Sequence, residues 1–350
     1  MSKNTTIFDV AKAANVSAAT VSRVLNNSAR VNSATKKRVT DAIESLGFIP
    51  SASAQSLKTS NTYTIGFLAS DISNIFHSTI ARGIEDVVNP ENYMMLLCST
   101  VEDPDRELAY LKMLVSKNVD ALIINPTGYN AEFIYEISKK IPTILLNRRI
   151  SHPHFSYDFF DTNGYQGSYI LTKQLLSMGH QRIFAITGPR HLSNAAARFR
   201  GFVAAMEESG ITVDDNYPYI FDGRFSYEGG VEAIDYLWSL PECPTAIVAQ
   251  NNFSTLGALY ALKQRNVSVP EDISLVSHDE LSNWDFMITR PTHVNFNLSL
   301  MAEEIGHRIL ARLNDPALEP AKFIYDPIVV PGNSVTIPTG GLKRKVFRPI

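Results

Sequence analysis

The sequence has few of the features that mark secreted, membrane-embedded or metal-binding proteins. Its 350 residues include two cysteines, Cys98 and Cys243, which form no motif, so neither a disulfide framework nor a zinc site is expected. No apolar run approaches the length of a membrane-spanning helix. The N-terminal stretch MSKNTTIFDV lacks the hydrophobic region of a secretory signal, so we expect a cytoplasmic protein with no membrane partner.

The patterns of common enzyme classes are missing as well. There is no G-x-G-x-x-G or Walker-type phosphate loop, which argues against a nucleotide cofactor. There is no G-x-S-x-G nucleophile elbow, and the eight histidines form no metal-binding pair at helical spacing. We therefore expect a protein that is not an enzyme and that has no catalytic residues, cofactor or metal site.

Charge is scarce, at 19% of residues, and it is unevenly distributed. Residues 1–60 contain eight Lys or Arg and three Asp or Glu, which gives this segment a net charge of +5. The whole chain carries −3, so residues 61–350 carry −8. A basic segment on an acidic body is typical of a nucleic-acid-binding module, because neutralising phosphates supplies most of the non-specific affinity for DNA.

The basic segment contains a helix-turn-helix pattern in residues 6–26, TIFDVAKAANVSAATVSRVLN. Thr6 and Asp9 form a capping box that starts a first helix. Asn15 stands where the chain must turn, and asparagine tolerates a left-handed backbone better than most residues. Ser17 can then cap a second helix, so two short helices joined by a tight turn are predicted.

A third helix is predicted from Asn32 or Ser33 to Gly47. Its buried face is expected to contain Val39, Ala42, Ile43 and Leu46. The second helix should turn outward Ala18, Ala19, Thr20, Ser22 and Arg23. Such a surface can enter a DNA major groove, where arginine reads guanine and the methyl groups of Ala or Thr touch thymine. A helical hairpin from an ordinary small domain is the alternative.

Residues 50–62, PSASAQSLKTSNT, resemble a linker. Residues 51–58 could form a short helix, although so short a helix is barely stable by itself. Leu57 has no obvious core to enter, and a leucine at such a place can act as a wedge between base steps in the minor groove. A flexible tether with an incidental leucine is equally consistent with these residues.

From Tyr63 onward, β-rich runs alternate with helical segments. The expected strands are Thr64–Ala69, Met94–Cys98, Ala121–Asn125, Thr143–Asn147, Ile183–Thr187, Ala246–Ala249 and Ile273–Ser277. Strands separated by helices predict parallel sheets, and these strands are too numerous for one doubly wound domain, so two similar lobes are expected. Ligands of such sheets bind beyond the carboxyl ends of the strands. The polar and aromatic residues that follow these strands suit a neutral polar ligand.

These motifs together resemble the lactose-repressor/galactose-repressor (LacI/GalR) family of bacterial transcription regulators. The resemblance covers nearly the whole chain, in the family's order, through TIFDVAKAANVSAATVSRVLN, SASAQSLKT, IGFLASDISNIF, EDPDRELAYL, ITGP, RFRGF, NNFSTLGALYAL and VPEDISLVSHDE. It implies a homodimer whose headpieces each read half of a near-palindromic operator in double-stranded DNA. It also implies a hinge helix in the minor groove and a two-lobed, periplasmic-binding-protein-like core that binds a small effector, usually a sugar.

The resemblance further implies particular site residues. Base-reading positions match Ala18, Ala19 and Arg23, and positions near phosphates match Thr6, Ser17, Thr20, Ser22 and Asn26. The minor-groove positions of the hinge helix match Ala54 and Leu57. The polar effector contacts match Asn147, Arg198, Asn251 and Asp279, and the aromatic positions around the effector match Phe76 and Phe225.

Other roles for the core residues stay open at this point. Asp279 could cap the next helix, Arg198 could pair with Glu207 at the surface, and the two phenylalanines could be core residues. The sequence also departs from the family's usual pattern. Asn147 and Asn252 stand where Asp is common, and Phe296 stands where a polar residue is common, which implies a pocket for a less hydroxylated or larger ligand.

The resulting prediction is an α/β protein with a helix-turn-helix headpiece at 1–49, a hinge at 50–62, a core at 63–340 and a basic tail at 341–350. The first lobe is expected at about 63–162 plus 293–322, and the second at about 163–292 plus 323–340. We expect a transcription regulator, most simply a repressor, that is controlled by a small effector. The alternatives are a periplasmic-type sugar receptor without a DNA role and an α/β enzyme, which would need a phosphate loop or an acid–base constellation.

Overall fold

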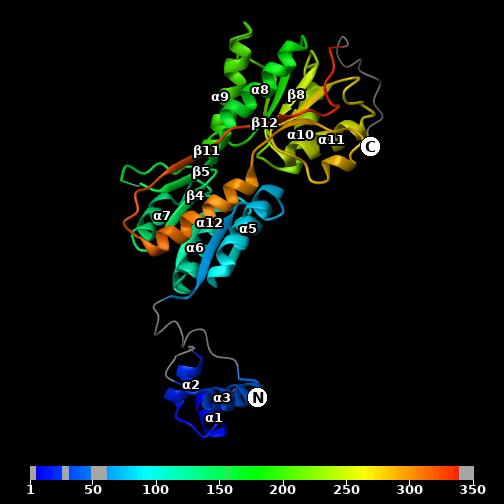
Figure 1. Ribbon diagram of the computed structural model, residues 1–350. Coiled ribbons are helices and arrows are strands. Elements are labelled where there is room, and N and C mark those ends of the chain that lie inside the picture. The colour runs from blue at the N-terminus through cyan, green and yellow to red at the C-terminus, as the bar shows by residue number, and fades with distance from the viewer. Residues whose placement is uncertain (1–4, 26–30, 49–60, 155, 339–350) are drawn as a thin grey trace. The chain divides into compact units, whose positions relative to one another are not determined.

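The computed structural model describes residues 5–25, 31–48, 61–154 and 156–338. The chain divides into two compact units, a headpiece at Met1–Thr62 and a core at Tyr63–Ile350, and each is considered by itself (Figure 1). Most of the predicted hinge and all of the basic tail lie outside the described residues. None of the helices in the described ranges is long and apolar enough to cross a membrane.

The headpiece begins with the two predicted helices, α1 (Ile7–Ala13) and α2 (Ala18–Leu25) (Figure 1). The capping box is present, because the Thr6 amide donates to Asp9 Oδ2 at 2.8 Å and the Asp9 amide donates to Thr6 Oγ1 at 3.4 Å. Asn15 has a φ of 51°, as the turn requires. The Thr20 amide donates to Ser17 Oγ at 3.1 Å, so both predicted helix starts are confirmed.

The third helix, α3 (Ser33–Leu46), closes a small core with the first two. Val10, Val21 and Val39 are fully buried, one from each helix, and each burial stabilises the headpiece by about 2 kcal/mol. The prediction that Leu46 is buried is wrong, because its side chain is 38% exposed. The helix ends directly after it at Gly47, and Phe48 beyond that end packs against the core.

The first lobe of the core is a six-stranded parallel sheet in the order β11-β5-β4-β3-β1-β2. Its strands are β1 (Thr64–Ala69), β2 (Met94–Ser99), β3 (Ala121–Ile124), β4 (Thr143–Leu146), β5 (Asp158–Thr162) and β11 (Lys322–Tyr325). One face packs against α5 (Ile75–Val88) and α12 (Leu298–Asn314), which lie side by side in Figure 1. The other face packs against α6 (Pro104–Ser116) and α7 (Ala131–Ser138).

The second lobe repeats this plan with the strand order β12-β10-β9-β8-β6-β7, in which β12 alone of the described strands pairs antiparallel. Its strands are β6 (Ile183–Thr187), β7 (Ile220–Asp222), β8 (Ala246–Ala249), β9 (Ser274–Ser277), β10 (Thr292–Asn295) and β12 (Ile328–Val330). α8 (Gly164–Ser177) and α9 (Ser193–Glu207) cover one face. α10 (Tyr227–Ser239) and α11 (Asn252–Gln264) cover the other. The predicted two-lobed α/β fold is confirmed.

The chain passes between the two lobes three times. At two of these three crossings the lobe boundary differs from the predicted one. β10 ends at Asn295 and pairs with β9, so residues 293–295 belong to the second lobe's sheet and not to the first lobe. β11 ends at Tyr325 and pairs with β5, so residues 323–325 belong to the first lobe's sheet. Strand pairing fixes these crossings, and neither strand had been recognised in the sequence.

Candidate functional site

The predicted DNA-contacting residues of the headpiece lie on and around α2. Thr6, Ser17, Ala19 and Arg23 are exposed, and Ala18, Thr20 and Ser22 are partly buried. The hydroxyls of Ser17 and Thr20 lie 2.9 Å apart, which gives the start of α2 two adjacent polar groups. Asn26, Ala54 and Leu57 lie outside the described residues. The described part of the predicted surface is therefore accessible to a partner.

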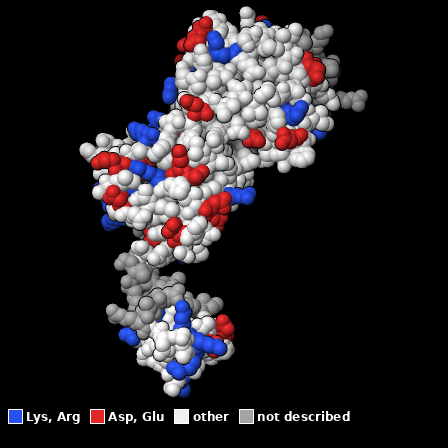
Figure 2. Space-filling view, viewed as in Figure 1, with Lys and Arg blue, Asp and Glu red and all other residues white. Residues whose placement is uncertain are grey.

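The headpiece surface is basic and has one prominent aromatic side chain. Lysine and arginine side chains gather on the headpiece face shown in Figure 2. The lysines and arginines of the described headpiece as a whole are Lys12, Arg23, Lys36, Lys37 and Arg38. Phe8 on α1 is 71% exposed, and the sequence analysis had not singled it out. In the sequence Phe8 looks like a core phenylalanine, and only the folded headpiece shows that its side chain is exposed.

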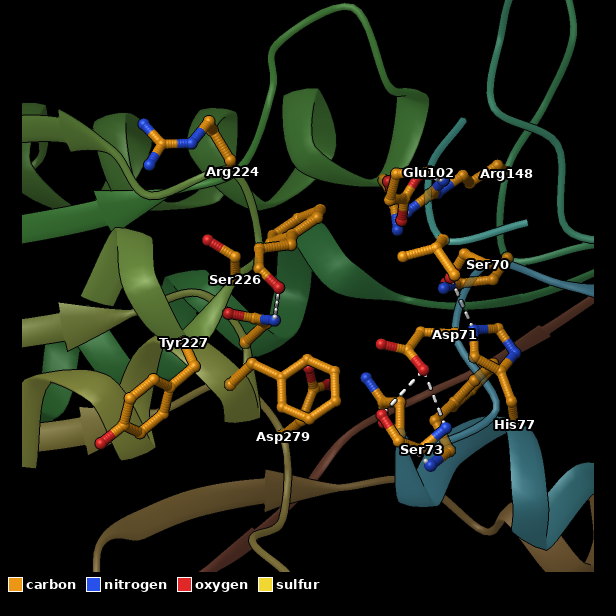
Figure 3. A pocket seen from close by; sticks show the side chains of 18 of the residues that line it. Ser70, Asp71, Ser73, His77, Glu102, Arg148, Arg224, Ser226, Tyr227 and Asp279 are labelled. Atoms are coloured by element: carbon orange, nitrogen blue, oxygen red, sulfur yellow. Dashed lines mark hydrogen bonds and ion pairs between the residues drawn. The ribbon is translucent and has the colours of Figure 1, made fainter. Parts of the chain in front are cut away.

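The core contains a cavity of about 430 Å³ between the two lobes, at the carboxyl ends of the strands. All six predicted effector residues line it, namely Phe76, Asn147, Arg198, Phe225, Asn251 and Asp279. Figure 3 shows first-lobe side chains such as Ser70 and Arg148 facing second-lobe side chains such as Ser226 across this space. The topology thus brings together residues that are up to 203 positions apart in the sequence.

Arg198 and Asp279 form the charged centre of the second-lobe wall. Arg198 projects from α9, and its Nη1 and Nη2 lie 3.0 and 3.4 Å from the two Asp279 carboxylate oxygens. Arg198 Nη1 also donates to the Gln250 carbonyl oxygen. Burial would raise the pKa of Asp279, but Arg198 and the His278 ring outweigh it and hold this pKa well below its usual range. Arg198 does not pair with Glu207, so that alternative is wrong.

His278 is a buried neighbour of this ion pair and contacts Asp279. Its Nδ1 lies 3.2 Å from Asp279 Oδ1, and its Nε2 lies 3.1 Å from the Gly164 carbonyl oxygen. Burial, and then the charge of Arg198, lower the pKa of His278 and favour the neutral ring. Both neighbours are hydrogen-bond acceptors, so a neutral ring donates to only one of them at a time.

Phe225 covers the second-lobe side of the cavity from the loop after β7. Arg224 and Phe225 have φ values of 53° and 54°, an unusual pair for non-glycine residues. The Phe225 ring occupies the space beside Gly188, where any side chain would collide with it. Asn251 holds the loop by donating from Nδ2 to the Phe225 carbonyl oxygen at 2.9 Å, and it caps α11.

Asn147 provides a free acceptor on the first-lobe wall. It is 8% exposed, and its Oδ1 has no hydrogen-bond partner in the structure. A buried amide oxygen without a partner is costly, so it calls for a donor supplied by a ligand or water. Nearby, His77 Nε2 lies 2.8 Å from Ser70 Oγ. Burial, then the charge of Arg148, lower the pKa of His77 to about 3 and keep its ring neutral.

The predicted effector residues did not include Arg148 and Glu102, the most strongly paired residues of the first-lobe wall. Arg148 donates from Nη1 and Nη2 to the two Glu102 carboxylate oxygens at 2.7 and 2.6 Å. Val101 and Glu102 have φ values of 53° and 58°. They are a second pair of consecutive left-handed residues, like Arg224 and Phe225 on the loop after β7. Strained backbone of this kind is found at ligand-binding sites, where packing over-determines it. The predicted effector residues included Phe225 from the loop after β7 and none from the loop after β2.

The arginines that line the cavity are already paired with carboxylates. Arg148 pairs with Glu102, Arg198 with Asp279, and Arg224 Nη2 with Glu232 Oε2 at 2.6 Å. The lining therefore favours a neutral ligand, because an anion would have to compete with a bound carboxylate. In the described part of the chain, no group of three or more His, Cys, Asp or Glu residues is arranged to hold a metal ion.

Comparison with known proteins identifies both units. Residues 62–313 match the family described as periplasmic binding proteins and sugar binding domain of LacI family. Residues 6–51 match the family described as bacterial regulatory proteins, lacI family. The chain belongs to the LacI family. It is a DNA-binding transcription regulator with a small-molecule effector domain, and the LacI headpiece rules out the alternative of a receptor without a DNA role.

Individual members of the LacI family support this over most of the chain. The HTH-type transcriptional repressor PurR of Aliivibrio salmonicida is 32% identical over 94% of this chain and 98% of its own length. The catabolite control protein A of Priestia megaterium is 34% identical over 79% of this chain and 82% of its own length. A lac repressor dimer bound to operator and the anti-inducer ONPF shares the fold, with a TM-score of 0.81, 23% identity and coverage of 95% and 100%.

Proposed function

We propose that this LacI-family regulator is a cytoplasmic repressor whose operator affinity is set by a neutral sugar bound between the two lobes. The observation that carries this proposal is the meeting of the six residues that the family resemblance implied around one cavity of about 430 Å³. In our proposal Arg198 and Asp279 bridge neighbouring hydroxyl groups, because a guanidinium donates and a carboxylate accepts at adjacent positions. Phe225 offers its ring face to the apolar face of the sugar.

Two further features of the cavity and one solved relative support a sugar. Asn147 Oδ1 accepts hydrogen bonds and has no partner, so it suits a hydroxyl donor. The paired arginines disfavour a phosphorylated ligand. A LacI-family regulator from Enterococcus faecium, 26% identical with a TM-score of 0.70 over 78% of this chain and 99% of its own, was solved with bound ribose. A nucleobase is the second candidate class, because it is also a neutral polar ligand.

A thermal-shift screen of the full-length protein tests the ligand class. The panel contains neutral monosaccharides, neutral disaccharides and nucleobases. At about 100 times its dissociation constant, a ligand stabilises the folded state by about 2.7 kcal/mol, which is a shift of several degrees for a protein of this size. We expect a sugar to produce that shift in the parent and not in Asp279→Asn. A shift with a nucleobase alone would contradict the sugar assignment.

We further propose that the headpiece reads one half-site of a near-palindromic operator through Ala18, Ala19 and Arg23. Thr6, Ser17, Thr20, Ser22 and Asn26 then contact phosphates, and Ala54 and Leu57 enter the minor groove. Two headpieces on one dimer raise the effective concentration at the second half-site. Effector binding changes the angle between the lobes, and hence the cost of placing both hinges on DNA. The coupling must be reciprocal, so operator DNA changes effector affinity by the same factor.

The second lobe has an exposed apolar surface that supports homodimer formation. Phe286 and Ile288, at and after the short helix η2 (Trp284–Phe286), are 89% and 95% exposed. Tyr260 on α11 is 48% exposed and lines the same hollow as Ile288. Exposed apolar patches of this kind mark protein interfaces. Sedimentation of the parent and of Ile288→Lys tests this, with a dimer expected for the parent and a monomer for the variant.

A further inference from the structure

The two lobes touch beside the effector pocket through a pair of amide side chains. Asn74 is the N-cap of α5 in the first lobe, and its Nδ2 donates to Asn252 Oδ1 at 3.2 Å. Asn252 is the first residue of α11 in the second lobe, and its Nδ2 donates to Asn74 Oδ1 at 2.9 Å. Each side chain therefore donates once and accepts once across the cleft.

Each amide is oriented by its own helix before the lobes meet. Asn74 Oδ1 also accepts the Phe76 amide at 3.0 Å, and Asn252 Oδ1 accepts the Phe253 amide at 2.9 Å. If either amide flipped, its NH₂ group would face a backbone N–H, and two donors cannot bond each other. The two side chains are thus prearranged for one another, which lowers the entropic cost of the contact.

This pair stands between two cavities. Asn74 lines the effector pocket, whereas Asn252 lines a second cavity of about 280 Å³, and Phe76 and Asp279 line both. The second cavity is also lined by residues of the lobe crossing, among them Val294, Phe296 and Leu298. Opening the amide pair would remove part of the wall between the two spaces.

Two other contacts between the lobes are of a different kind. The Arg149 amide donates to Ser193 Oγ at 2.8 Å, so this contact uses one backbone donor. The rings of Tyr129 and His191 lie 5.1 Å apart and pack without a hydrogen bond between them. Neither contact provides a reciprocal pair, and neither borders the second cavity.

We propose that the Asn74–Asn252 pair is a latch that holds the two lobes closed around the effector pocket and separates that pocket from the second cavity. The family's common Asp at position 252 would lack the NH₂ group that donates to Asn74, so the reciprocal pair depends on asparagine here. A ligand that favours closed lobes gains the two hydrogen bonds, and a ligand that favours open lobes must break them. The consequence for effector response rests on the proposed function, but the latch itself does not.

The distance between the lobes tests this directly. Nitroxide labels on Lys117→Cys and Asp215→Cys, both exposed and one on each lobe, report this distance by pulsed electron spin resonance in the full-length chain. Cys243→Ser removes the partly buried native thiol. Without ligand or DNA, Asn252→Ala should raise the open-to-closed ratio about tenfold, because it removes two hydrogen bonds between the lobes.

Two further variants keep the test decisive. Asn74→Ser retains an N-cap for α5 but is too short to reach Asn252, so it should reproduce the same shift even if Asn252→Ala fails to fold. Asn130→Ala is the matched control, because its Nδ2 donates to the Pro104 carbonyl oxygen at 2.9 Å and to Glu107 Oε2 at 2.6 Å within the first lobe. It should lower the melting temperature and leave the inter-lobe distance unchanged.

The latch is overturned if folded Asn252→Ala or Asn74→Ser shows the parent's distance distribution, or if Asn130→Ala opens the lobes equally. Since the sample contains neither DNA nor effector, that result would leave the proposed regulator function standing. Conversely, a sugar screen without any hit would leave the distance measurement valid.

Discussion

Arg198 Nη1 lies 3.0 Å from Asp279 Oδ2, and this ion pair joins α9 to the strand-end segment after β9 inside the effector pocket. The two residues are 81 positions apart in the sequence. Their pairing leaves the second-lobe wall neutral while it still presents a fork of donors beside a pair of acceptors. A hydroxylated neutral ligand can use both without displacing either partner.

Asp279→Asn should abolish the effector response and leave operator binding intact. The amide has the size of the carboxylate but offers Arg198 one weaker acceptor, so ligand affinity should fall at least tenfold. Calorimetric titration of the sugar identified by thermal shift measures this loss. Arg182→Ala, which removes an arginine 41% exposed on the outer surface of the same lobe, is the control and should bind the sugar as the parent does. A normal response in Asp279→Asn would mean that the pocket is misplaced.

Asn147→Gly should separate ligand binding from folding. Its φ of 60° suits glycine, and its buried Oδ1 has no partner to lose, so unfolding free energy should stay within about 1 kcal/mol of the parent. The sugar loses one acceptor, and its affinity should fall about five- to tenfold. Denaturant unfolding and calorimetry on the same samples check both values. An unchanged affinity would show that Asn147 does not face the ligand.

Arg23→Ala should relax operator specificity at one base pair of each half-site. Arg23 is exposed on α2, where a guanidinium can bond the major-groove edge of guanine, and loss of such a contact costs about 1–3 kcal/mol. Binding to a panel of operators substituted at each position measures the change. If affinity drops equally for every sequence, Arg23 contacts phosphates and not a base.

Leu57→Gly should abolish specific operator binding and leave effector affinity unchanged. Leu57 lies outside the described residues, so this prediction depends on the sequence and the family resemblance. Glycine removes the apolar wedge and makes the short hinge helix less stable. A gel-shift titration compares the variant with the parent. Equal operator affinities would remove the proposed role of the hinge.

Asp161 should make the core less stable as pH rises. Burial, opposed by Arg149 and Arg198, raises the pKa of Asp161 to about 7, and its Oδ1 has no hydrogen-bond partner. The folded carboxyl keeps its proton to about pH 7, whereas the unfolded one loses it near pH 4. Folding therefore becomes less favourable between these values. The unfolding free energy of Asp161→Asn should equal that of the parent near pH 4. At pH 8 it should exceed the parent's value by about 1–4 kcal/mol. Urea unfolding across this range should show a flatter pH profile for the variant.

Local signals made much of the fold predictable. The capping box at Thr6 and the turn at Asn15 depend on neighbouring residues, so the sequence alone located α1 and α2. Seven strands were recognisable as short apolar runs, and six of them are buried, whereas β2 is largely exposed or half-buried. β7, β11 and β12 are short and half-exposed, and their register is set by partners far along the chain, so no local pattern revealed them. The lobe boundary at 325 was misplaced for the same reason, whereas the boundary at 295 was misplaced because β10, although buried, has only four residues, THVN, with no continuous apolar run.

The pocket was predictable where a residue lies at the end of a recognised strand or within two positions of it. Asn147, Asn251 and Asp279 are of this kind, and the structure brings them together. Glu102 was missed because it follows β2 in a left-handed turn that its side chain gives no reason to expect. The hydrogen-bonded pair of Asn74 and Asn252 could not be predicted from the sequence either, because it depends on how the two lobes close.

The central claim is that a basic headpiece binds specific duplex DNA and that a small ligand in the core adjusts this binding. The most direct measurement selects duplexes from a random pool with the full-length protein, then follows affinity against salt with and without the sugar that raises its melting temperature. We predict a near-palindromic preferred site, an affinity that falls linearly with salt on logarithmic axes, and a change of about 5- to 150-fold on adding the sugar. No preference for any duplex over random competitor, with or without the sugar, would contradict the account.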